Sequence, residues 1–144
     1  MIELGTNVRP SERGQSLVEL MVSITFMLVL LAGIVDFGRA FFVYMELRDA
    51  AQEGAIYGSA YPNDPAGIVE RVRKTSRNPI ELDDTSIVTV NQSFPDGSDC
   101  KGNGVEVIVS YEFPITMPFL GAIIGEQSFP LSASATDTIL RSTC

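Results

Sequence analysis

Residues Gly14–Tyr61 read GQSLVELMVSITFMLVLLAGIVDFGRAFFVYMELRDAAQEGAIYGSAY, and this stretch decides how the rest of the chain is organised. Its first half contains sixteen consecutive residues without a charge, Leu20–Val35. Together with the apolar residues just before it, this run has about the length that a helix needs to cross a bilayer. No proline interrupts the stretch, and most of its residues favour helix. We therefore expect one helix over about 15–60, roughly 70 Å long, whose first half, about 17–35, lies in a membrane.

Glu19 is the unusual residue of this segment, because it stands at the start of the apolar run. It follows the pattern Arg-Gly-Gln-Ser-Leu-Val, so that Gly14 lies five residues before it. Further on, residues 33–40 read GIVDFGRA and residues 50–55 read AAQEGA. Through these motifs the first 60 residues or so resemble the TadE-like pseudopilins, which belong to the wider type IV pilin superfamily.

The resemblance implies that a prepilin peptidase cuts the chain between Gly14 and Gln15 and leaves the apolar run in the mature protein. Residues 1–14 would then be a leader peptide, and Glu19 would be the fifth mature residue. The resemblance also implies a platform and a dedicated ATPase that move the mature chain from the membrane into a filament.

The chemistry of Glu19 supports an assembly role. A lone charge at bilayer depth costs roughly 2–4 kcal/mol, so Glu19 requires a partner there. Cleavage would create an α-ammonium at Gln15, and a carboxylate buried in a helix bundle is tolerable when such a cation from a neighbouring subunit meets it. The alternative is that Glu19 lies at the membrane surface and reaches water without a specific partner.

Composition and charge narrow the remaining classes. A chain of 144 residues suggests one domain plus an anchor, and its net charge of −8 argues against a nucleic-acid partner. Arg9 and Arg13 favour keeping the N-terminus in the cytoplasm. We therefore expect a single-pass inner-membrane protein with its C-terminus outside.

Asp36 and Arg39 lie three residues apart on one helix face and can form an ion pair at the outer end of the span. Such a pair can serve only its own helix, or it can contact another subunit. Beyond it, small residues recur every four positions in two adjacent rows, which permits close packing. We expect this face to pack on the chain's own globular part; the rows are Ala50, Gly54 and Gly58, and Ala51, Ala55 and Ser59.

Residues 62–144 are expected to form an α+β head. Asp64 and Pro65 predict the start of a short helix, about 65–76, with a basic side formed by Arg71, Arg73, Lys74 and Arg77. This basic side is either solvated or docks on an acidic sister subunit. After it, three runs of alternating apolar and polar residues predict a small three-stranded antiparallel sheet packed on the long helix, in a pilin-like fold; the runs are 86–94, 105–113 and 128–138.

Cys100 and Cys144 are the only cysteines of the chain. In an antiparallel meander, the loop that holds Cys100 and the end of the third strand lie at the same end of the sheet. The two residues can then form a disulfide outside the cytoplasm, although two separate thiols remain the alternative. At the opposite end, Ile115–Gly125 is an apolar connection that either contacts a partner or a membrane, or caps the core of the sheet.

No residue set predicts catalysis or a cofactor. The chain has no histidine, no glycine-rich phosphate loop and no G-x-S-x-G motif, and two cysteines without histidine cannot make a tetrahedral metal site. Asp83 and Asp84 form an acidic pair that solvation explains better than metal binding. We expect neither an enzyme nor a metalloprotein.

The sequence thus predicts a structural subunit, a minor pseudopilin or filament subunit, of a tight-adherence pilus. Its expected partners are membrane lipid, other pilin subunits, the prepilin peptidase, and the assembly platform with its ATPase. Its expected location is first the inner membrane and then the extracellular pilus. The second hypothesis is a permanently anchored membrane protein whose outer domain binds partners. A membrane-anchored enzyme is the third.

Overall fold

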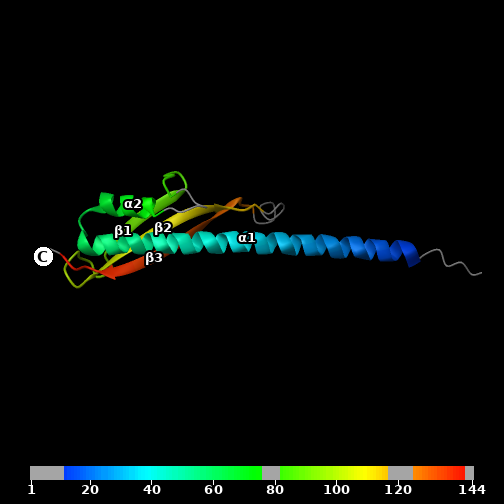
Figure 1. The fold of residues 1–144 in the computed structure, drawn as a ribbon, viewed down its shortest axis with the longest axis horizontal. Coiled ribbons are helices and arrows are strands. Elements are labelled where there is room, and N and C mark those ends of the chain that lie inside the picture. Colours follow the sequence, from blue (N-terminus) through cyan, green and yellow to red (C-terminus); the bar gives the residue numbers. More distant parts are fainter. Residues whose placement is uncertain (1–11, 76–81, 117–124, 142–144) are drawn as a thin grey trace, which may run out of the picture. The chain divides into compact units, whose positions relative to one another are not determined.

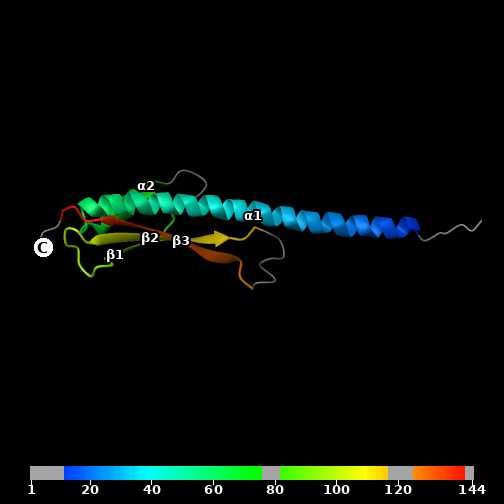
Figure 2. The ribbon, with the colours of Figure 1, turned by 90° about the horizontal axis from the view of Figure 1, so that it is seen from below.

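The structure is a computed structural model, and it describes residues 12–75, 82–116 and 125–141. It is an α+β fold with a pilin-like arrangement: one long N-terminal helix and a small open antiparallel sheet (Figures 1 and 2). In chain order, the elements are α1 (Glu12–Ala60), α2 (Pro65–Lys74), β1 (Val88–Ser93), β2 (Gly104–Pro114) and β3 (Ser128–Thr138).

The chain divides into two compact units, Met1–Val35 and Asp36–Cys144, and α1 contributes residues to both. Within the first unit, α1 begins at Glu12, three residues before the expected start, because nothing in the sequence between Glu12 and Gln15 stops a helix. The large apolar side chains of this unit that the structure describes are all exposed, from 50% at Ile24 to 72% at Met27.

The second unit is built on the sheet. The strand order is β1-β2-β3 and both pairings are antiparallel, so the predicted meander is confirmed. All eleven residues of β2 pair with β3, from Gly104 opposite Thr138 to Pro114 opposite Ser128. The alternation predicted for β2 is also confirmed, because Val105, Val107 and Val109 are fully buried. β1 is shorter than expected and begins at Val88. The Val88 N–H donates a hydrogen bond to the Asp84 carbonyl, which closes the turn before the strand.

The residues of α1 that follow Asp36 cover one face of this sheet. Leu47, Ala50 and Ala51 are fully buried, and Ala55 and Ser59 are nearly so. A Cβ added to Gly54 would lie 2.7 Å from Val72 Cγ2 and 3.1 Å from Val107 Cγ1, so the helix backbone approaches its neighbours closely there. The expectation that the two rows of small residues pack on the chain's own head is confirmed.

α2 lies against the same core, with Ile68 and Val72 buried. It begins as the sequence predicts: Pro65 is its first residue, and the Asp64 carboxylate accepts a hydrogen bond from the Gly67 N–H at 3.0 Å. It ends at Lys74. The second unit, which we call the head from here on, therefore has two layers: α2 and the second half of α1 lie on one face of the sheet, and the opposite face is largely polar.

Candidate assembly surface

The apolar half of α1 holds most of the exposed large hydrophobic side chains among the described residues. Among the described residues, one helix is long and apolar enough to cross a membrane, and this is the one, near the N-terminus. The apolar side chains surround the helix rather than forming one stripe, since neighbours such as Met27, Leu28 and Val29 are all more than half exposed. A helix that is apolar on every side requires an apolar environment on every side.

The predicted processing and assembly residues lie at the start of this helix. Gly14 and Gln15 are in its first turns, and Glu19 is one turn after Gln15 on the same face. All three are exposed. If the chain were cut after Gly14, the helix would begin at Gln15, and the positive end of the helix dipole would add to the new α-ammonium. That end of the helix would then attract the carboxylate of a neighbouring Glu19.

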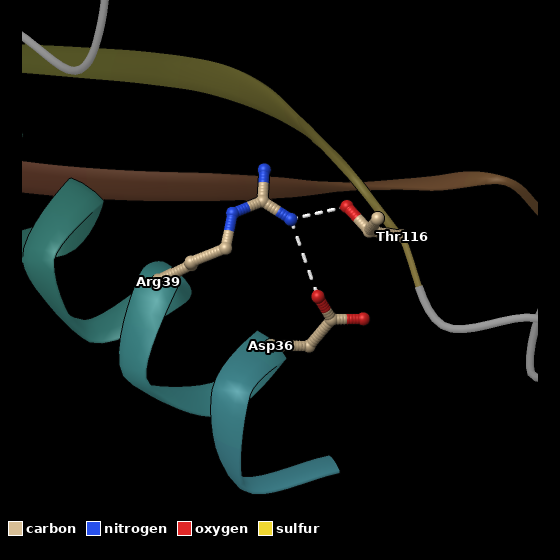
Figure 3. A network of polar contacts seen from close by, with 3 residues as sticks. All are labelled: Asp36, Arg39 and Thr116. Carbon is tan, nitrogen blue, oxygen red and sulfur yellow. Dashed lines mark hydrogen bonds and ion pairs between the residues drawn. The ribbon is translucent and has the colours of Figure 1, made fainter. Parts of the chain in front are cut away.

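Asp36 and Arg39 form the expected ion pair, and the pair reaches further than the sequence indicated. Arg39 Nη1 lies 3.2 Å from Asp36 Oδ1 and also donates a hydrogen bond to the hydroxyl of Thr116, two residues after the end of β2 (Figure 3). The guanidinium carbon lies 5.3 Å from the centre of the Phe113 ring. Arg39 thus connects α1 to the last residues of β2 within its own chain.

We expect Arg39→Lys to lower the stability of the head by about 0.5–1 kcal/mol. Lysine keeps the charge, but a compact ammonium lacks the planar donor fork that meets Asp36 and Thr116 and stacks over Phe113. The effect stays small because the Arg39 side chain is 45% exposed. Thermal unfolding followed by circular dichroism measures it, with Arg48→Lys, at an exposed position of the same helix, as the control. Equal unfolding temperatures for the two variants would contradict a structural role for the network.

The basic side of α2 is less available than its charge suggests. The Lys74 ammonium pairs with Glu70, Arg73 Nη1 donates to the Asp83 carbonyl at 2.8 Å, and the Arg71 guanidinium carbon lies 5.6 Å from the centre of the Tyr57 ring. Arg77 lies outside the described residues. Each described member therefore has a partner in its own chain, which favours the solvated interpretation over docking.

Asp64 is the polar link between α1 and α2. Besides the Gly67 N–H, it accepts a hydrogen bond from the Tyr57 hydroxyl at 2.9 Å. Both bonds favour the ionised carboxylate, so the pKa of Asp64 is lowered, chiefly by the Gly67 N–H and then by Tyr57. The same contact with Asp64 raises the pKa of the Tyr57 phenol. The pKa of Asp64 is thus lower in the folded protein than its ordinary value of 3.8, so the ionised carboxylate stabilises the fold above that value. This stabilisation is lost as the pH falls through the pKa that Asp64 has in the folded protein.

We therefore expect Tyr57→Phe to raise the pKa of Asp64 part of the way towards its ordinary value, because the Gly67 bond remains. Carboxyl chemical shifts followed by NMR during an acid titration measure this change. Asp84 is an internal control: its pKa is lowered by the hydroxyl and N–H of Ser86 and should not change. An Asp64 titration curve that is the same in both proteins would show that the phenol does not stabilise the carboxylate.

The loop before β2 lies beside the residues that follow β3. Gly102 N–H donates to the Ile139 carbonyl at 2.9 Å, and Ile139 N–H donates to the Asn103 carbonyl at 2.8 Å. Cys100 is half-buried in this loop. Cys144 lies outside the described residues, so its pairing with Cys100 stays a prediction.

One surface was missed in the sequence. The outward face of α1 in the second unit remains apolar for more than two turns after Asp36, with exposed Phe37, Phe41, Phe42, Tyr44 and Met45. Helical spacing alone could have separated these residues from buried Val43 and Leu47, which lie on the opposite face. The apolar connection predicted over Ile115–Gly125 falls mostly outside the described residues. Among the described residues, no group of three histidine, cysteine or acidic side chains could hold a metal ion.

Residues 14–55 match the family model described as TadE-like protein, and no curated protein or solved structure matches the chain. The match begins at Gly14, includes Glu19 and the whole apolar run, and ends within the small-residue rows. It leaves out α2 and the sheet. The match agrees with the resemblance drawn from the sequence: residues 14–55, fewer than half of the chain, are similar to TadE-like proteins and contain the hydrophobic N-terminal helix.

Proposed function

We propose that this chain is a structural pilin-like subunit of a tight-adherence pilus. A prepilin peptidase cuts it between Gly14 and Gln15, residues of about 17–35 anchor it with the N-terminus inside, and the platform and ATPase then move it into the filament. The observation that carries the proposal is the TadE-like match over residues 14–55, which starts at the glycine of the cleavage pattern.

The exposed apolar helix supports both stages of this life cycle. Over residues 14–35, which the structure describes, every large apolar side chain of the helix is at least half exposed. Lipid satisfies them while the subunit is anchored. Helices of sister subunits replace lipid in the filament, where the head becomes the outer surface.

Glu19 gives the assembly its register. In the filament core, its carboxylate would meet the Gln15 α-ammonium of a neighbouring subunit, and each helix could dock only where charge meets charge. A mismatch by one helical turn would leave both charges buried and unpaired, at a cost of about 3–5 kcal/mol.

The Cys100–Cys144 disulfide would hold the end of the chain to the head. The two hydrogen bonds between the Cys100 loop and Ile139 support it, because they hold the chain beside that loop five residues before Cys144. A disulfide between two residues as far apart in sequence as Cys100 and Cys144 typically stabilises a domain by about 2–4 kcal/mol.

Intact mass and the N-terminal peptide of the chain isolated from cells test processing and the bridge together. We expect a mature chain that begins at Gln15, with a mass two hydrogens lower before reduction than after it. The control is the Gly14→Val variant, which should keep residues 1–14. An assembled chain that retains residues 1–14 would contradict the ammonium partner of Glu19 and favour a permanent membrane anchor.

A further inference from the structure

The outward face of α1 changes its chemistry within the second unit, and the change is abrupt. Phe37, Phe41 and Phe42 are 75%, 53% and 68% exposed, and Tyr44 and Met45 complete an apolar surface. From Arg48 onward the exposed residues of the helix are mostly charged or polar, namely Arg48, Asp49, Gln52 and Glu53. We call Phe37, Phe41, Phe42 and Tyr44 the aromatic collar.

The charges near the collar do not interrupt it. Arg39 is the only charged residue between Phe37 and Met45. Its side chain points towards the sheet (Figure 3). The guanidinium pairs with Asp36 of the same helix, donates a hydrogen bond to Thr116 and lies over the Phe113 ring. Asp36 is only 15% exposed. The two charges therefore meet each other and the sheet rather than the collar side. The next charged residue, Glu46, is half-buried, so the first exposed charge after the collar is Arg48.

The proposed span leads directly into the collar. Residues of about 17–35 make about 28 Å of helix, and the hydrocarbon layer is about 30 Å thick, so Val35 lies near its far side. The headgroup region adds about 5–8 Å, and the helix enters it with the residues that follow Val35. The collar begins there, at Phe37.

Aromatic side chains suit such a position. Tyrosine and tryptophan gather where acyl chains meet headgroups, and phenylalanine supplies a large apolar surface next to them. Single exposed phenylalanines need no explanation on a soluble surface, but three within two helical turns, continuous in sequence with an apolar span, do.

We propose that the aromatic collar lies in the headgroup and acyl boundary of the outer leaflet while the subunit is anchored. The boundary between membrane and water then falls near the end of the collar, before the exposed charges that begin at Arg48. The first turns of the head's own helix face lipid on the collar side and the sheet on the other. This inference rests on the proposed membrane span, but not on cleavage or on filament formation.

Single tryptophan variants test the position directly, because the natural chain has no tryptophan. Phe41→Trp places the probe in the collar, and Gln52→Trp is the matched control, eleven residues later on nearly the same helix face and also exposed. Leu28→Trp is the positive control within the apolar run. Each full-length variant is reconstituted in phosphatidylcholine bilayers with and without brominated acyl chains, and acrylamide serves as the aqueous quencher.

We expect brominated lipid to reduce the emission of Leu28→Trp and Phe41→Trp, with a blue-shifted maximum in both, and to leave Gln52→Trp unchanged. Acrylamide should quench the emission of Gln52→Trp strongly and that of Leu28→Trp and Phe41→Trp weakly. If Leu28→Trp is quenched by lipid and Phe41→Trp only by acrylamide, the collar is in water and the inference is wrong while the anchor stands. If Phe41→Trp is shielded from both quenchers, a second copy of the chain covers the collar, which also overturns the inference. If Leu28→Trp escapes brominated lipid, the membrane span itself fails.

Discussion

Replacing Glu19 by glutamine is expected to leave membrane insertion intact and to remove the chain from filaments. Glutamine has nearly the shape of glutamate, so only the charge is lost. In the membrane, that loss is favourable, because a carboxylate at bilayer depth costs roughly 2–4 kcal/mol. In the filament, the same loss leaves the α-ammonium of a neighbouring Gln15 buried without its counter-charge. One unpaired buried charge costs about 3–5 kcal/mol, which is more than a hundredfold in a subunit contact.

The measurement compares the chain in the membrane fraction with the chain in sheared, pelleted filaments by immunoblotting. Glu53→Gln is the matched control, since it removes an exposed carboxylate from the same helix in the head. It should assemble normally. Normal filament incorporation of Glu19→Gln would place Glu19 at the membrane surface without a specific partner, and the filament would then have to rest on other contacts.

Replacing Gly54 by leucine is expected to destabilise the head by about 3 kcal/mol or more. Even the first added carbon would lie 2.7 Å from Val72 Cγ2 and 3.1 Å from Val107 Cγ1. Both neighbours are fully buried valines, whose branched side chains have little freedom to turn away. The remaining leucine atoms can fit only if α1 separates from the sheet and α2. Overpacking of this kind typically costs about 1–3 kcal/mol, and a whole side chain at a backbone contact lies at or above the upper end.

Gly38→Leu is the matched control, because a Cβ at Gly38 would meet nothing within 4 Å. Leucine favours helix over glycine by close to 1 kcal/mol, so this variant should be as stable as the natural chain or more stable. Urea unfolding of the full chain in detergent micelles, followed by circular dichroism, measures both. Similar midpoints for the two variants would mean that α1 is not held closely against the sheet at Gly54.

Much of the head could be predicted from the sequence because its signals are local. Alternation along β2 places Val105, Val107 and Val109 on the buried face, and the chemistry of Asp64 and Pro65 starts α2. The helix of the small-residue rows was predictable for the same reason, since spacing of three and four residues defines a face. These signals need no knowledge of where distant residues lie.

The extent of the apolar surface could not be predicted in the same way. A count along the chain ends the uncharged run at Asp36, because Asp36 and Arg39 are both charged. In the structure their charges meet each other, and Arg39 also meets Thr116, 77 residues away. Helical spacing can separate Phe37 and Phe41 from buried Val43 and Leu47, but only the distant contact with Thr116 shows that the nearby charges turn towards the sheet.

The meander also leaves its two outer strands, β1 and β3, with one unpaired side each among the described residues. β3 is an edge of the sheet, and among the described residues no strand pairs with its outer side. Unpaired edges invite the same edge of another molecule, and natural proteins guard them with proline and with inward charges. Near the start of β3, Pro130 has no N–H that another strand could bind. Near its end, the charged Asp137 lies on the same inward face of the sheet as Ala133. Between them, Leu131–Thr136 has neither guard. At the high local concentration of a purified preparation, aggregation is expected to begin there, and a lysine at exposed Ser134 is the substitution that should suppress it.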